Sequence, residues 1–565
     1  MKKIWDIKPR TEVSLLQQIL VNRGVPATNV EEFLVPNFER DTHSFDKFTK
    51  MPIAVARLFD ALANEEKIVI HGDYDADGVS GTSLLYAAIR DICKALEIPF
   101  MVEAFLPDRE KDGYGVAMHN VERFAREGVR LLITVDCGIA NGLELGRAHE
   151  LGVDSIVCDH HQMGDHFPEH SIILHPLAPG ETYPNKTLCG TGVAYKFACG
   201  LINEARNHGA DIPEGYEKWM LDLVAVATVT DVMPLIGENR ALEFFGLKVL
   251  QKTRRPGLKA LIDSTGTEPA DIDTQAIGFR IGPRLNAAGR LSSAKIAFDA
   301  LSADTFEEAA APVVRLEALN KERQALFAEM YKIAKEQVKG HGDAMPVLVV
   351  HSEGWLPGIV GLIAGRLVSE FGKPAFAFTN VGEHVVGSGR SLGGLHLVEA
   401  MNSCGDLFVK KGGHPQACGL TLHSTETVPL FREQVNTFAR AYFGEVGPVD
   451  KLLIDAEVPL AEVTFELLKM LNSCQPFGEG NRPPVFSATK LKVREVMPMG
   501  ATGAHVRLNV NDDVGLPFKL VGFSMGHLLG TVKIGDTIDV AYEAGENEWN
   551  GRKEVQYRII DVNIC

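Results

Sequence analysis

Short apolar runs that end in a polar or Gly-rich turn recur in the first third of the chain, and they constrain its fold more than any other feature. They are Lys67–Ile70, Met101–Leu106, Arg130–Val135 and Val153–Cys158. Each has the length of a buried strand, and helix-like segments at Val79–Leu96 and His119–Glu127 lie between them. The alternation predicts an α/β fold of βαβ units with a mainly parallel sheet.

Acidic residues follow three of these runs. Asp73, Asp136 and Asp159 come just beyond the ends of predicted strands. In open α/β sheets the carboxyl edge is where ligands bind, so we expect a functional site at this edge.

The rest of the chain changes character twice. Residues 306–337 are rich in Ala, Glu, Lys and Arg and predict a long connecting helix. A second α/β lobe comes next, with expected strands at 346–350 and 374–379 and helices at 359–371 and 397–403. From Lys451 onward only strands are expected, at a spacing that favours a small OB-type β-barrel. We therefore divide the chain into an N-terminal extension packed on the domain after it (1–50), a parallel-sheet domain (51–240), a helical connector with an Arg-rich motif (241–340), the second lobe (341–447) and the barrel (448–565).

Composition restricts the possible partners and the compartment. The 565 residues include 57 Lys+Arg and 74 Asp+Glu, a net charge of -17, so global attraction cannot bring this protein to a polyanion. Nine cysteines without a Cys-x-x-Cys pair indicate reduced thiols rather than disulfides or structural zinc. No apolar stretch has the length of a signal peptide or a membrane span, so a cytoplasmic protein without membrane contact is expected.

Four segments together offer the ligands that divalent cations need for phosphate chemistry, namely hard oxygens with some imidazole. The candidates are His71, Asp75 and Asp77 in one turn, Asp136, the triplet Asp159-His160-His161, and Asp231. Each cluster alone is equally well explained by a helix N-cap or a turn residue. Their joint occurrence at strand and helix ends of one sheet predicts a site for two divalent ions, Mn or Mg, because the ligands are oxygen-rich.

These motifs resemble the DHH phosphoesterase family, named for the Asp-His-His seen at Asp159–His161. His71–Gly78 is similar to the first motif of the family, Val135-Asp136 to the second and Thr230–Val232 to the fourth. The resemblance implies one ion held by His71, Asp75 and Asp136, and another held by Asp77, Asp136, His160 and Asp231. It also implies catalytic roles for Asp136 and for His161, the latter at the scissile phosphate or the leaving group. Asp73 is left as a catalytic residue, a ligand, a partner of a ligand or a helix cap.

Arginines and glycines elsewhere are candidates for binding substrate phosphates. The stretch Arg280–Arg290 offers Arg280, Arg284, Asn286 and Arg290. The alternative is that its arginines pair with surplus carboxylates. In the second lobe, two Gly-rich motifs either cradle anionic oxygen or make tight turns; they contain Ser388, Arg390, Ser391, Gly412, Gly413 and His414. They resemble the DHH-associated substrate-binding domain, and Arg109 is implied to join Ser388 and Arg390 at a terminal 5′ phosphate.

The barrel and the family branch suggest the substrate. Aromatic residues of the barrel are either core residues or platforms for base stacking: Phe518, Phe523, Tyr542 and Trp549. The loop Phe477–Asn481 and the barrel itself resemble the DHH branch of single-strand-specific 5′-to-3′ DNA exonucleases, which act in repair and recombination. That branch implies a monomer acting on single-stranded DNA with a 5′ end, with a single-strand-binding protein and a helicase as partners. The alternatives are a DHH hydrolase of short oligonucleotides, cyclic dinucleotides or pyrophosphate, and a non-catalytic strand-binding scaffold.

Overall fold

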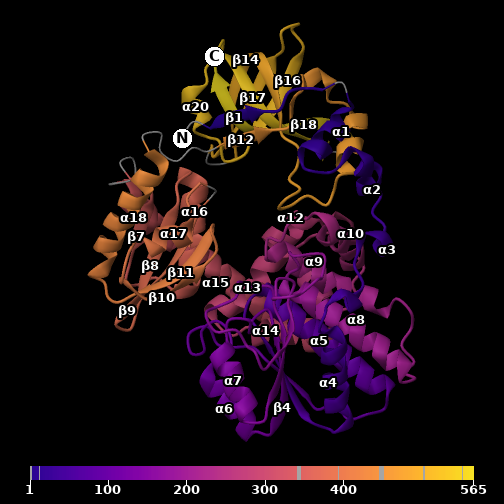
Figure 1. Ribbon diagram of the computed structural model, residues 1–565. Helices are drawn as coiled ribbons and strands as arrows, with labels where there is room; N and C mark the ends of the chain where they lie inside the picture. The colour runs from indigo at the N-terminus through magenta and orange to yellow at the C-terminus, as the bar shows by residue number, and fades with distance from the viewer. Residues whose placement is uncertain are drawn as a thin grey trace. The chain divides into compact units, whose positions relative to one another are not determined.

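The protein divides into two compact units, one formed by Met1–Asn37 with Val449–Cys565 and the other by Phe38–Pro448 (Figure 1). The computed structural model describes residues 3–11, 13–339, 345–391, 394–444, 451–500, 503–549 and 551–565. The expected domain boundaries at 340 and 447 lie outside these ranges. Within them, no helix is both long enough and apolar enough to cross a membrane.

The larger unit contains a five-stranded sheet in which all neighbouring strands are parallel, in the order β3-β2-β4-β5-β6. The strands are β2 (Lys67–Gly72), β3 (Val102–Phe105), β4 (Val129–Val135), β5 (Asp154–Cys158) and β6 (Ile172–Leu174). The predicted parallel sheet is therefore confirmed. The three-residue edge strand β6 was not predicted, since so short a run carries no periodic signal.

Helices cover both faces of this sheet, which is why its strands are apolar in consecutive positions. One face carries α4 (Met51–Ala63), α5 (Ala76–Ala95) and α8 (Gly190–Asn207), and the other carries α6 (Met118–Arg126) and α7 (Gly142–Glu150) (Figure 1). In β2, Ile68 and Ile70 belong to the first of these cores and Val69 to the second. The alternation of side chains along each strand thus holds the sheet between two helical layers.

A helical region comes after the sheet. It consists of α9 (Leu221–Thr230), α10 (Gly237–Leu250), α11 (Pro256–Ser264), α12 (Thr274–Ala276), the π-helical turn η5 (Ile277–Ile281), α13 (Gly282–Leu291), α14 (Lys295–Ser302) and α15 (Phe306–Lys339). The helix α15 is the long connector that the sequence predicts. The Arg-rich stretch Arg280–Arg290 is helical over its full length, since it spans the end of η5 and nearly all of α13.

The second lobe of this unit has a mixed sheet in the order β10-β11-β9-β8-β7. Its elements are β7 (Leu348–His351), α16 (Pro357–Phe371), β8 (Ala375–Val381), β9 (His384–Arg390), α17 (Leu397–Asn402), β10 (Phe408–Gly413), β11 (Ala417–Leu422) and α18 (Thr427–Phe443). The predicted α/β lobe is confirmed, but β9, β10 and β11 were missed because their glycines suggested turns. Position 387 of β9 requires glycine, because a Cβ there would come within 2.3 Å of the Phe378 ring.

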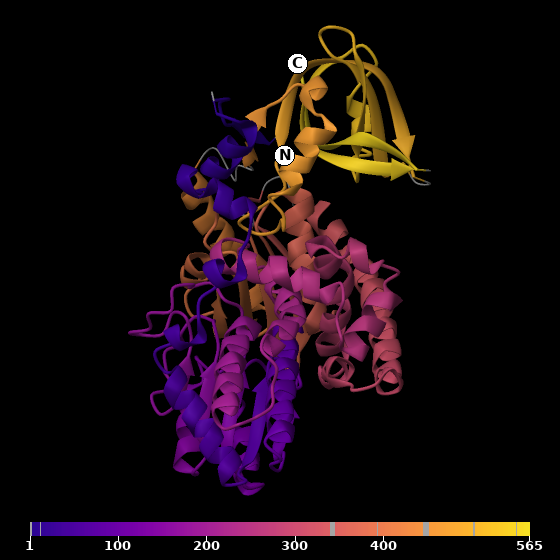
Figure 2. The same cartoon turned by 90° about the vertical axis from the view of Figure 1, so that its right-hand side faces the viewer.

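In the smaller unit, the chain from Ala456 onward forms a closed barrel (Figure 2). Its strands are β13 (Ala456–Glu457), β14 (Phe486–Met499), β15 (His505–Asn511), β16 (Pro517–Gly522), β17 (Thr537–Trp549) and β18 (Arg552–Ile564), with α19 (Phe465–Asn472) and α20 (Leu528–Thr531). Pairing of β14 with β17 closes the sheet, as expected for an OB-type barrel. Tyr542 is a core residue whose hydroxyl donates to the Val458 carbonyl, whereas Phe523 is exposed. The side chain of Trp549 lies outside the described residues.

The N-terminal segment belongs to the barrel unit, which corrects the expectation that it packs on the domain after it in the chain. Strand β1 (Ile4–Ile7) pairs in parallel with β12 (Lys451–Ile454). Helix α1 (Leu15–Asn22) places Leu15 and Ile19 in the barrel core, and α2 (Val30–Leu34) comes after it. The buried ion pair of Arg23 with Asp455 spans 3.5 Å. Only from α3 (Phe38–Asp41) onward does the chain join the larger unit.

Candidate metal centre and phosphate-binding site

Four segments bring carboxylates and imidazoles to the carboxyl edge of the parallel sheet. Strands β2, β4 and β5 end immediately before Asp73, Asp136 and Asp159, and Asp231 is the residue that ends α9. Asp75 caps α5, because its carboxylate accepts hydrogen bonds from the backbone N–H groups of Asp77 and Gly78. The edge position that the sequence predicts for these residues is therefore observed.

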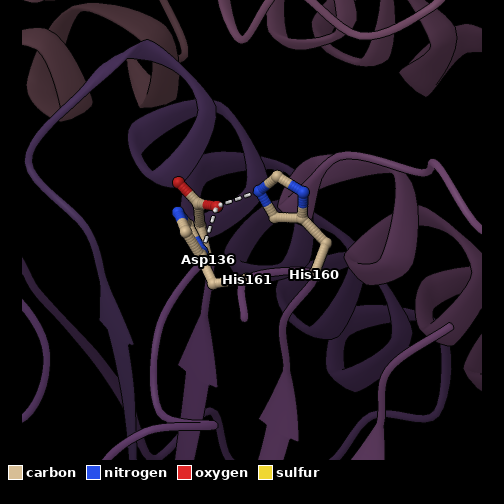
Figure 3. A group of neighbouring side chains, drawn as sticks. All are labelled: Asp136, His160 and His161. Atoms are coloured by element: carbon tan, nitrogen blue, oxygen red, sulfur yellow. Dashed lines mark ion pairs between the residues drawn. The ribbon is translucent and has the colours of Figure 1, made fainter. Parts of the chain in front are cut away.

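One oxygen of Asp136 lies between two imidazoles. Asp136 Oδ1 is 3.1 Å from His160 Nε2 and 3.7 Å from His161 Nδ1 (Figure 3). His160 Nε2 also lies 3.4 Å from Asp231 Oδ2 and 3.8 Å from Asp77 Oδ2. Three sets of potential ligand atoms result, each within 4.8 Å of one another: Asp136-His160-His161, Asp77-His160-Asp231 and Asp73-Asp75-Asp136. Asp136 belongs to two of them, the position required of a carboxylate that bridges two ions.

The donor set fits divalent cations. Several buried atoms at this edge have no hydrogen-bond partner: His71 Nε2, Asp73 Oδ1, Asp136 Oδ1, His160 Nε2 and Asp231 Oδ2. Leaving such atoms unsatisfied is costly, and coordination would satisfy them. His71 is fully buried but belongs to none of the three sets.

Asp159 organises the two histidines, a role that the sequence analysis did not assign. Its buried carboxylate accepts hydrogen bonds from the backbone N–H groups of Ile139 and His160, at 2.9 and 2.7 Å, and lies 2.9 Å from His161 Nδ1. Burial alone would raise the pKa of Asp159, but the hydrogen bond and charge of His161 hold that pKa below its usual range. Burial likewise opposes the charged form of His161, yet Asp159 raises the pKa of His161 to about 9. His161 is therefore held as an imidazolium facing the site.

Without cations the site carries more negative charge than its buried position tolerates. Burial and the neighbouring Asp75 raise the pKa of Asp73 to about 8. Burial, followed by repulsion from Asp77 and other carboxylates, raises the pKa of Asp136 well above its usual range. Burial lowers the pKa of His160 to about 4, so this imidazole is neutral and able to ligate. Clustered acids with raised pKa values are typical of a site that binds cations.

This charge makes the metal-free protein sensitive to pH. The folded-state pKa of Asp73, about 8, lies above the unfolded value of roughly 3.9. Its contribution to stability is therefore present below about pH 4 and is lost as the pH rises through about 8. We expect the thermal unfolding temperature in chelator to fall between about pH 5 and about pH 8.5, and Mn²⁺ to weaken or reverse that trend. Asp73→Asn should reduce the slope in chelator; an unchanged slope would contradict the assignment.

The backbone conformation of Asp136 and the N-terminus of α8 position Asp136 and Asp77 at this site. Asp136 adopts a left-handed conformation with φ of 63°, which is uncommon outside glycine and is found at functional sites. A Cβ on Gly190 would approach the Asp136 Cβ to 2.6 Å, so only glycine lets α8 begin here. Asp77 accepts the backbone N–H groups of Gly190 and Thr191 at 2.8 and 2.7 Å. The N-terminus of α8 thus stabilises the charge of Asp77.

The arginines of the Arg-rich stretch have different surroundings. Arg280 donates to Thr267 Oγ1 at 2.8 Å, and Arg284 forms an ion pair with Glu317, which is the alternative that the sequence analysis left open. Asn286 accepts the backbone N–H of Ala76 at 2.9 Å and so anchors α13 to the acidic turn. Arg290 is partly buried and donates to the Gly358 carbonyl at 2.8 Å.

Arg109 contacts helix α13, and two residues of the Gly-rich motifs contact helix α16. Arg109 stacks 3.9 Å from the centre of the Tyr74 ring and donates to the Gly289 carbonyl. A Cβ on Gly361 of α16 would lie 3.2 Å from Arg390 Nη2 and 3.4 Å from Ser388 Oγ. These side chains therefore occupy the space left by that glycine.

The remaining candidates of the second lobe come at the ends of β9 and β10. Ser391 is buried, and its Oγ has no hydrogen-bond partner. Gly412 and Gly413 end β10, and His414 comes directly after them. Burial, then repulsion from His161, lowers the pKa of His414.

A parallel sheet with shared carboxylates and an Asp-His-His triplet at its carboxyl edge defines a DHH-type phosphoesterase domain. The family profile described as "DHH family, N-terminal domain" matches residues 67–228, the "DHHA1 domain" matches 344–441 and the "RecJ OB domain" matches 454–561. The three matches succeed one another in chain order.

The chain belongs to the RecJ family. It is 34% identical over 552 residues to the single-stranded-DNA-specific exonuclease RecJ of Bacillus subtilis, covering 97% of this chain and 68% of that protein. The Escherichia coli protein of the same name is 30% identical, with 97% and 95% covered. Among solved structures, RecJ of Thermus thermophilus in complex with Mn²⁺ matches with a TM-score of 0.82 and 28% identity, covering 100% of this chain and 80% of that one. A complex of that protein with Mg²⁺ matches with a TM-score of 0.75 and 26% identity. The carboxylate and imidazole groups described above thus lie in a fold whose solved relatives bind Mn²⁺ and Mg²⁺.

Proposed function

We propose that this protein is a single-stranded-DNA-specific 5′-to-3′ exonuclease that hydrolyses phosphodiester bonds in DNA repair and recombination. The observation that carries the proposal is the Asp136 carboxylate, which belongs to two sets of potential metal ligands. The names of the curated relatives, which span nearly the whole chain, support the substrate.

His71, Asp75 and Asp136 would hold one ion, and Asp77, Asp136, His160 and Asp231 the other. The close approach of Asp73 to Asp75 and Asp136 favours Asp73 as a further ligand of the first ion. The ions, when bound, would activate water and neutralise the charge that develops on the phosphate.

The chain's own residues would orient the substrate and manage its charge. His161 carries a proton because Asp159 stabilises its charged form, so its imidazolium would face the scissile phosphate and donate a hydrogen bond to it. Asp159 acts through His161 and is a positioning residue. Asp136 connects both ligand sets, so its side chain would fix their spacing.

Substrate-binding roles are proposed for Arg109, for the Arg-rich stretch and for the Gly-rich motifs of the second lobe. Arg109, Ser388 and Arg390 would hold the terminal 5′ phosphate, since each carries donors beside Gly361 or Gly289. Further contacts to the strand are proposed for Arg280, Arg284, Asn286, Arg290, Ser391, Gly412, Gly413 and His414. For Arg284 this requires that the strand compete with Glu317.

The test is a time course with Mn²⁺ on a long single strand that carries a 5′ phosphate and a label at its 3′ end. We expect progressively shorter labelled products, because residues are removed from the 5′ end. A duplex of the same sequence and a dinucleotide serve as comparisons. Faster hydrolysis of the dinucleotide, or loss of the 3′ label as mononucleotide at the outset, would overturn the proposal.

We also propose that the protein acts as a monomer in the cytoplasm, together with a single-strand-binding protein and a helicase. The structure shows no disulfide among the cysteines that it describes, which suits a reducing compartment.

A further inference from the structure

A stretch of the larger unit is strongly basic although the whole chain is acidic. Residues 244–262 run from the second half of α10 into α11 and contain five basic side chains and no acidic one, in a chain with a net charge of -17. The basic residues are Lys248, Lys252, Arg254, Arg255 and Lys259. Since the protein as a whole repels a polyanion, a polyanion has to be attracted by a local excess of positive charge such as this one.

Three carboxylates line a cavity beside this stretch, and each already has a basic partner. Asp222 pairs with Arg255 at 3.3 Å, and Asp91 and Asp304 both pair with Arg90. The other four basic residues of the stretch are exposed and lie within ion-pair distance of no carboxylate in the described part of the chain. Their charge is therefore available to an anion from outside.

Two of the four exposed cations share one aromatic ring at the cavity. The Arg254 guanidinium stacks 3.5 Å from the centre of the Trp219 ring, and Lys252 Nζ lies 5.6 Å from the same centre. The cavity has a volume of about 240 Å³. Tyr216 and Ser302 also line it, and Ser302 Oγ is buried without a hydrogen-bond partner among the described residues. One water molecule needs only roughly 10–15 Å³, so a planar group such as a base is able to enter beside Trp219.

The other two cations also lie against rings. Lys248 Nζ is 3.9 Å from the centre of the half-buried Phe244 ring. Lys259 Nζ is 5.8 Å from the centre of the Phe306 ring, which is 54% exposed. Cations interleaved with aromatic rings are typical of surfaces that bind single-stranded nucleic acid. We name the following set the basic surface: Lys248, Lys252, Arg254, Lys259, Trp219, Phe244 and Phe306.

The basic surface lies away from the metal ligands, at the other end of the helices that carry them. Helix α9 begins two residues after Trp219 and ends directly before Asp231, so its ten residues separate that ring from that ligand by about 15 Å. Helix α11 extends from the basic surface towards the proposed strand contacts, because Ser264 near its end donates to Glu317, the partner of Arg284. A strand of sufficient length is therefore able to reach both places.

We infer that the basic surface is a second binding surface for the single strand and holds a stretch downstream of the end that lies at the metal site. The inference rests on the proposed function and extends it to residues remote from the metals. Phosphates of the strand meet the cations, and bases stack on the rings without sequence preference, because every base has a face that stacks. An acidic peptide would require the cations alone, so the ring beside each cation favours a strand.

The test measures binding of a labelled single strand of about 40 nucleotides, longer than a usual binding site, at several salt concentrations. Chelator is present, so no cleavage is expected. The variant replaces Lys252, Arg254 and Lys259 together with glutamine. We expect Kd to rise about 10- to 100-fold at roughly 0.1 M salt, and the slope of log affinity against log salt to become shallower by about 2, since each phosphate contact contributes about 0.7.

The matched control replaces Lys47, Lys50 and Arg315 with glutamine. These residues are exposed basic side chains outside the basic surface, and their replacement changes the net charge by the same amount. The control should bind the strand with the Kd of the unaltered protein. Equal losses in both triple variants would show that only the net charge matters and would overturn the inference, as would an unchanged Kd in the first.

Trp219→Ala tests the aromatic part of the surface. We expect its Kd to rise about 5- to 100-fold with an unchanged salt slope, because stacking is not ionic. Trp219→Phe keeps a ring and should retain most of the affinity; if Trp219→Ala does not fold, the glutamine variant decides. A polyglutamate peptide that binds the unaltered protein but not the glutamine variant, while the strand binds both equally, would assign the surface to an acidic protein instead. Failure of the proposed function would be seen separately, as an intact strand after incubation with Mn²⁺.

Discussion

Replacing Asp136 with asparagine is expected to lower strand cleavage by at least about 1000-fold, the scale of losing a group that organises charge in the transition state. Its carboxylate belongs to the ligand sets around His160 and around Asp75, so the variant weakens both ion positions at once. Asparagine is preferred to alanine because it has nearly the same shape and tolerates the φ of 63° observed here. The measurement is the initial rate on a labelled single strand with saturating Mn²⁺.

The fold should survive this change. Removing one of several buried like charges relieves repulsion, so the metal-free variant should unfold at the same temperature as the unaltered protein or a higher one. Asp154→Asn is the control, since Asp154 lies at the opposite end of β5 and pairs with Arg57 at the surface. Cleavage by the Asp136 variant within about tenfold of normal would show that the site lies elsewhere.

Removal of divalent cations is expected to abolish cleavage and to lower the unfolding temperature, and Mn²⁺ or Mg²⁺ should restore both. The buried ligand atoms that lack partners, among them His71 Nε2 and Asp231 Oδ2, would again be unsatisfied, and Asp231 would be repelled by the neighbouring carboxylates. At a metal concentration of 100 times Kd, binding to the folded state stabilises a protein by about 2.7 kcal/mol. Calorimetry in chelator and in excess Mn²⁺ measures this difference.

The Asp136→Asn variant connects these two predictions. Because it loses a ligand common to both positions, Mn²⁺ should raise its unfolding temperature by clearly less than that of the unaltered protein. Activity that persists in chelator, or an equal Mn²⁺ effect on both proteins, would argue against a metal centre at Asp136.

Much of the catalytic domain can be predicted from local sequence. Apolar runs such as Lys67–Ile70 predict strands because both faces are buried, and the parallel order places the residues after them at one edge. Asp136 and the triplet Asp159–His161 could therefore be assigned to one site from their positions in the chain. The connector α15 was equally predictable, since its periodic composition extends over 34 residues.

Other features depend on contacts between residues far apart in the chain, and no local pattern predicts them. The pairing of β1 with β12 joins the two ends of the chain in one unit. Gly387 and Gly389 suggested turns, but they lie in β9. These positions require glycine because the rings of Phe378 and Phe376 fill the space that a side chain would occupy. Whether an arginine is paired also depends on distant residues: Arg284 meets Glu317, whereas Arg323 meets no carboxylate among the described residues.

The kind of site in this protein could be predicted from the sequence, because the types of ligand residue and their positions after predicted strands are local properties. The roles of single side chains depended on tertiary contacts. Asp159 became the residue that holds His161 charged, since folding buried it among four hydrogen-bond donors. Burial and partner geometry set the charge and direction of each group, and both exist only once the chain has folded.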